Sequence, residues 1–137
     1  MQKLSMKWIV VLASVLVFGV SSAYADKAVM ISSPEDGATV SSPVKVCMEV
    51  KGVEVEPAKN GVHEGKGHHH LLIDTDLPAD LSKPIGKDDQ HVHMGDGSTC
   101  KELTLAAGKH TIQTLFAKGD HVPYSPALTS KITITVK

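Results

Sequence analysis

The feature that most constrains the fold is an alternation of apolar and polar residues that recurs along the chain. Residues 131–137 read KITITVK, with isoleucine or valine at every second position, and residues 44–50 repeat the pattern as VKVCMEV. Successive side chains of a β-strand point to opposite faces of a sheet, so each segment is predicted to be a strand with one buried face. No segment after residue 25 has a sustained helical period.

Further strand candidates, separated by turn-forming residues, cover the rest of the chain. They are residues 28–31, 68–74, 100–105 and 109–117. About seven short strands divided by such turns predict an all-β fold, an immunoglobulin-like β-sandwich. Two longer polar gaps, 56–67 and 75–90, bracket the histidine-rich strand, and long loops on a small scaffold are where binding residues tend to lie.

Residues 1–25 have the three-part pattern of a cleavable secretory signal peptide. Lys3 and Lys7 precede an uncharged apolar run at 8–20, and small residues end the segment at Ala25. The run is too short for a membrane-spanning helix, which needs about 20 apolar residues. We therefore predict a signal peptide at 1–25, a single β-sandwich domain at 26–137, a periplasmic or secreted location, and no membrane association after cleavage.

Composition argues against two classes of ligand. The chain has no arginine, and without Lys3 and Lys7 the 14 lysines become 12 against 15 acidic residues, a net charge of −3 for residues 26–137. Nucleic-acid recognition normally uses a basic surface with guanidinium groups, so no nucleic-acid partner is predicted. Phe116 and Tyr124 are the aromatic residues left in that range, too few for a carbohydrate-binding platform.

The two cysteines lie on matching phases of their strands. Cys47 is on the outward phase of residues 44–50, and Cys100 is on the outward phase of residues 100–105. In an immunoglobulin-like order these are the second and fifth strands, which neighbour each other, so a cross-strand disulfide on the solvent side is geometrically possible. The alternative is that one or both thiolates bind a soft metal ion.

The eight histidines all lie between residues 63 and 121, and four of them form two His-x-His pairs. His68 and His70 share one face of a predicted strand, and so do His91 and His93. Each pair can offer two imidazoles to one metal ion from a rigid element. These four residues are the predicted ligands of a copper or zinc ion, with copper preferred.

Two further residues are candidate ligands. Met94 follows the second pair and would add a soft ligand for Cu(I), and His121 lies in a predicted loop from which it could complete the site. A cluster of histidines held together by hydrogen bonds is the alternative interpretation.

Signatures of catalysis are missing. The chain has no Gly-x-Ser-x-Gly motif, and no serine or cysteine is paired with a base by its spacing, so no catalytic residues are predicted.

Longer blocks of the sequence resemble a known family. Residues 33–46 look like the opening of bacterial immunoglobulin-like modules. The block GHHHLLIDTDLPADLSKPI at 67–85, together with 88–99 and 105–136, is similar to the bacterial family named domain of unknown function 4399. The resemblance implies a small secreted β domain. It also implies that five histidines belong to the family signature: His68, His69, His70, His91 and His93.

Three hypotheses for function follow. The first is an exported domain that binds copper or zinc through clustered histidines and acts in metal handling or tolerance. The second is a non-enzymatic module of the cell envelope with structural histidines, whose partner is an envelope protein or polymer. The third is a small metalloenzyme of redox type.

Overall fold

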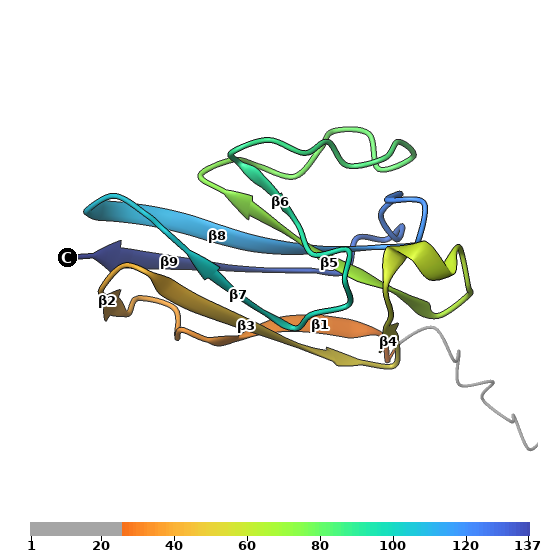
Figure 1. Ribbon diagram of the computed structural model, residues 1–137, viewed down its shortest axis with the longest axis horizontal. Helices are drawn as coiled ribbons and strands as arrows, with labels where there is room; N and C mark the ends of the chain where they lie inside the picture. The colour runs from red at the N-terminus through yellow and green to blue at the C-terminus, as the bar shows by residue number, and fades with distance from the viewer. Residues whose placement is uncertain (1–25) are drawn as a thin grey trace, which may run out of the picture.

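The computed structural model describes residues 26–137, and they form two packed β-sheets (Figure 1). The predicted signal peptide lies outside the described residues. One sheet contains three antiparallel strands in the order β1 (Ala28–Ser33), β3 (Val44–Lys51) and β7 (Cys100–Leu103). The strands of the other sheet are β2 (Thr39–Val40), β9 (Thr129–Val136), β8 (Gly108–Ala117), β5 (Lys66–Ile73) and β4 (Glu54–Val55), and β6 (His91–His93) also pairs with β5.

The first strand of the chain switches between the sheets, as it does in immunoglobulin-like domains. β1 pairs with β3 in one sheet, and after a turn β2 pairs in parallel with β9 in the other sheet. The all-β sandwich predicted from the alternation is therefore confirmed. Residues 26–137 form nine strands rather than about seven, and three of them, β2, β4 and β6, are segments of only two or three residues.

The main core lies between the two sheets. The inward residues of β3, such as Val46 and Met48, pack against Leu71 of β5, Ile112 of β8 and Ile134 of β9. Val46, Met48 and Ile134 are apolar positions of the alternating segments, and each fully buried aliphatic side chain contributes roughly 1.5–3 kcal/mol.

A second layer of packing covers the outer face of the six-stranded sheet. Leu72 of β5 and Leu115 of β8 pack there against Ile85, which comes from the long 75–90 connection. Figure 1 shows this connection in green, on the side of β5 and β6 away from the three-stranded sheet. Strand β5 is consequently buried on both faces, which explains why GHHHLLI does not alternate.

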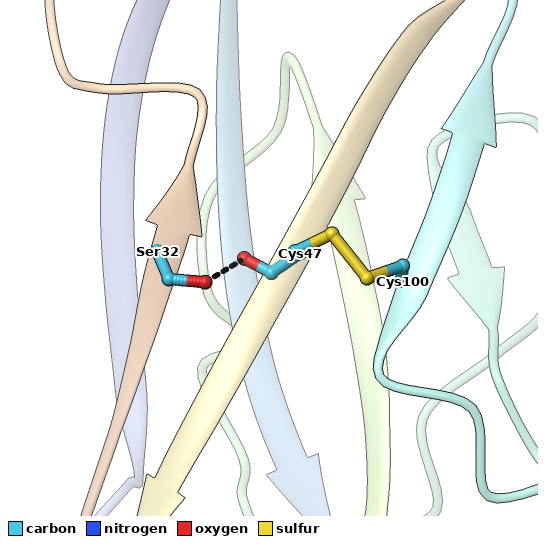
Figure 2. The surroundings of a disulfide bond; sticks show 3 residues. All are labelled: Ser32, Cys47 and Cys100. Atoms are coloured by element: carbon cyan, nitrogen blue, oxygen red, sulfur yellow. Dashed lines mark hydrogen bonds between the residues drawn. A yellow bond between two sulfur atoms is a disulfide. The ribbon is translucent and has the colours of Figure 1, made fainter.

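The two cysteines form a disulfide in the three-stranded sheet (Figure 2). Cys47 of β3 and Cys100 of β7 lie directly opposite each other, with their Cα atoms 4.1 Å apart. The Ser32 hydroxyl of β1 donates a hydrogen bond to the Cys47 carbonyl oxygen at 3.2 Å. Both sulfurs belong to this bond, so neither is a thiolate available to a metal ion.

Among residues 26–137, no helix is long and apolar enough to span a membrane.

Replacing both cysteines by serine is expected to destabilise the protein. The bond closes a sequence separation of 53 residues, and the loop-entropy relation gives about 4 kcal/mol for a loop of that length. Urea denaturation of the wild type and of the Cys47→Ser/Cys100→Ser variant measures the difference. The wild type in the presence of dithiothreitol should unfold like the variant, and equal stabilities with and without the bond would contradict the expectation.

Candidate metal centre

Strand β5 directs two imidazoles to the outer face of the six-stranded sheet. His68 and His70 alternate with His69 along the strand, so they share a face with Leu72, whereas His69 points into the sandwich. The side chains of His68 and His70 are 0% and 1% exposed. Their ring centroids are 4.7 Å apart.

The neighbouring strand β6 supplies a third imidazole. The β5–β6 register pairs His93 with His70, and their ring centroids are 5.1 Å apart. Gly95 leaves the space that this ring occupies, because a Cβ atom at residue 95 would overlap the His93 ring. The sequence signal for this arrangement is a glycine two residues after a histidine, which is too common to be recognised without the structure.

A turn after β8 supplies the fourth imidazole. The His121 amide donates to the Lys118 carbonyl oxygen at 2.8 Å, and His121 adopts the left-handed conformation with φ of 66°. Residues other than glycine adopt this conformation at a cost of about 1 kcal/mol or more, and such strain is concentrated at functional sites. The His121 carbonyl oxygen accepts a hydrogen bond from the Ile85 amide at 2.9 Å, which attaches the 75–90 connection to this turn.

The four histidines converge on one point. They are His68, His70, His93 and His121, and one ring nitrogen from each lies within 4.8 Å of the others. His68 Nε2 and His121 Nδ1 are 3.1 Å apart. A tetrahedral ion with metal–nitrogen bonds of about 2.0–2.1 Å requires ligand atoms about 3.3 Å apart. The group is therefore near the size at which an ion could be bound.

Some ring nitrogens of this group lack a hydrogen-bond partner. Three buried ring nitrogens have no hydrogen-bond partner among the described residues: His68 Nδ1, His70 Nδ1 and His93 Nε2. A buried polar atom without a partner costs about 1–3 kcal/mol. The group itself contains no carboxylate, so a cation that accepts nitrogen lone pairs is the ligand that fits it best.

Burial keeps the cluster in the form that binds metals. Burial, with smaller contributions from the neighbouring histidines, lowers the pKa of His68 to about 4 and that of His70 to about 3. Burial also lowers the pKa of His93, with smaller contributions from His121 and Lys87. Neutral imidazole is the metal-binding species, so these rings are available as ligands at neutral pH.

Two of the predicted ligands lie elsewhere. His91 is at the start of β6, and its Nδ1 donates to the Asp88 carboxylate at 2.7 Å. Met94 is 2% exposed and packs in the main core with Leu71, because it follows His93 and points to the opposite face. The structure thus brings together four of the six predicted residues and leaves these two outside the group.

The other four histidines each have a partner of their own. The Nδ1 atoms of His63, His69 and His91 contact Glu56, Thr114 and Asp88 respectively. His110 donates from Nδ1 to the Asp74 carboxylate at 2.6 Å and from Nε2 to the Ala106 carbonyl oxygen at 2.8 Å, which raises its pKa. These four histidines therefore contact partners outside the four-histidine group, although the buried Nε2 atom of His69 also lacks a hydrogen-bond partner among the described residues.

Fold and site together define a small immunoglobulin-like domain with a four-histidine group that could hold a metal ion. The chain belongs to the family described as Domain of unknown function (DUF4399), whose model matches residues 46–137. All four converging histidines and both cysteines lie within the matched range. No curated protein and no solved structure matches the chain.

The metal-free protein is expected to lose stability as the pH falls below about 6.5. Unfolded histidines bind protons there, whereas His68, His69 and His70 stay neutral in the folded state down to pH values of about 4, 4 and 3. Each one contributes a slope of about 1.4 kcal/mol per pH unit. Urea denaturation between pH 7.5 and pH 5 in the presence of a chelator, at intervals of about half a unit, measures the slope.

The apolar variant His70→Leu provides the control, since it should remove the contribution of one histidine from that slope. Equal stabilities of the wild type at both ends of the range would show that these histidines take up protons without unfolding.

Proposed function

We propose that the protein is an exported domain that binds one transition-metal ion, copper or zinc, and acts in metal handling or tolerance. Its ligands are His68, His70, His93 and His121. The observation that carries this proposal is the convergence of four imidazoles, three of which have a buried nitrogen without a hydrogen-bond partner among the described residues. A hydrogen-bonded structural cluster explains less, because among the described residues a single hydrogen bond, between His68 and His121, links the four rings.

The arrangement of the rings favours zinc over Cu(II). The six distances between ring centroids range from 4.7 to 5.9 Å. A planar square would make two of the six about 1.4 times the others, whereas a tetrahedron makes all six equal, and zinc prefers the tetrahedron. Met94 lies in the core, which removes the soft ligand that favoured Cu(I). Copper remains the natural competitor, since nitrogen sites generally bind Cu(II) more tightly.

Four protein ligands also argue for holding an ion rather than for catalysis. Catalytic zinc sites usually have three protein ligands and an open position, whereas sites with four are usually structural. His93 and His121 are only partly buried, so an ion can be exchanged from that side.

Metal titration of untagged protein is the decisive experiment. We expect one zinc ion per chain with submicromolar affinity by calorimetry. His93→Ala and His121→Ala should each weaken binding by about 100-fold or more, because changes to residues that merely support a ligand already cost 10–100-fold. The matched control is His91→Ala, which removes the other histidine of the same pair and should leave the affinity unchanged.

Circular dichroism of the metal-free variants checks that each one folds. Substoichiometric or micromolar binding by the wild type, or equal losses in His91→Ala and His93→Ala, would overturn the assignment. A parallel titration with Cu(II) tests the preference for zinc, and Co(II) tests the geometry, because tetrahedral cobalt absorbs visible light far more strongly than octahedral cobalt does.

Export is supported by the pattern at residues 1–25 and by the Cys47–Cys100 bond, since disulfides persist in oxidising compartments. Expression of the full chain in a bacterial host should yield protein in the periplasm or medium. Its intact mass should correspond to a chain that begins at Asp26 with two fewer hydrogens than the reduced form. A full-length mass in the cytoplasmic fraction would contradict this part of the proposal.

A further inference from the structure

A pocket of about 260 Å³ opens directly onto the four-histidine group. His70, His93 and His121 line it from one side, and Ile85, Gly86 and Lys87 of the 75–90 connection line it from the other. His68 belongs to the four-histidine group but does not line the pocket. An ion held by the four imidazoles would therefore border the pocket through the other three.

The residues that line this pocket include the ammonium of Lys87 and no carboxylate. Four neutral imidazoles leave the full charge of a divalent ion uncompensated. The charged residues that act on His93 are Lys87, which lines the pocket, and Asp96, whose effect is the smaller of the two. A divalent ion together with the Lys87 ammonium would thus concentrate positive charge on a small, partly enclosed volume, where charges interact more strongly than in water.

We infer that this pocket is the binding site of a small anion, which binds between the metal ion and the Lys87 ammonium. The inference rests on the proposed metal site. The anion supplies the negative charge that the ligand set lacks and adds to the metal as a fifth ligand, an expansion that zinc tolerates. Pockets for drug-sized molecules measure about 300–1,000 Å³, and this pocket is smaller. The occupant is therefore a small carboxylate or an inorganic anion. It is either free or the end group of a larger molecule that extends into solvent.

Azide is a suitable probe of this site in cobalt-loaded protein. Azide should change the visible spectrum of bound Co(II) in a saturable manner, and acetate should compete with it. Lys87→Gln should weaken azide binding by about tenfold, the typical effect of losing one charge-assisted hydrogen bond, and Lys87→Glu should weaken it further. Both variants should keep their affinity for Co(II) or gain some, because a repelling charge is removed.

Lys83→Gln is the matched control. Lys83 belongs to the same connection but pairs with Asp80 at 3.3 Å and is 77% exposed, so its loss should not affect azide binding. To distinguish a free anion from the end group of a larger molecule, the affinity for acetate is compared with that for short glycine peptides that have a blocked N-terminus and a free C-terminal carboxylate. Tighter binding of the peptides supports an end group, and equal or weaker binding supports a free anion.

The outcomes separate the two proposals. A protein that binds Co(II) tightly but whose spectrum does not respond to azide would overturn the anion site and leave the metal site intact. An equal effect of azide on the wild type and on Lys87→Gln would remove Lys87 from the site. Failure to bind Co(II), zinc or copper would overturn both proposals.

Discussion

The burial of strand β5 on both faces is the constraint on which the rest of the structure depends. β5 pairs with β8 along one edge and with β4 and β6 along the other, so its backbone is bonded on both sides. One face forms the core between the sheets, and the other is covered by the 75–90 connection and the turn at His121. Polar side chains on such a strand need partners within the protein or a bound ligand. The Nδ1 atom of His69 contacts the Thr114 hydroxyl, whereas His68 and His70 on the outer face are grouped with two other histidines.

Much of the scaffold was predictable because its determinants are local. Alternation over a few residues defined the strands at 44–50 and 131–137 and placed Cys47 and Cys100 on the outward phase, and the structure joins them. The same spacing placed His68 and His70 on one face. The same alternation also accounts for Met94, which was named as a candidate ligand. Met94 has the phase of Val92 rather than that of His93, so its side chain lies in the core.

The remainder of the site depends on contacts that no local pattern contains. His91 has the same phase as His93, but its Nδ1–H donates a hydrogen bond to the carboxylate of Asp88, three residues earlier. His91 therefore lies outside the four-histidine group. His121 reaches the cluster from a turn more than fifty residues beyond His68, and only the β5–β8 pairing brings them together. Two further features also depend on tertiary packing: the fit of the His93 ring beside Gly95, and the packing of Ile85 over the outer face of β5.

The disulfide and the four imidazoles lie on opposite outer faces of the sandwich. Cys47 and Cys100 are on the solvent side of the three-stranded sheet, the histidines are on the far side of the other sheet, and packed sheets are about 10 Å apart. Thiols released by a reductant therefore cannot reach an ion in the histidine group. The ligands that the protein itself supplies to such an ion would remain the four imidazoles in oxidising and reducing surroundings alike.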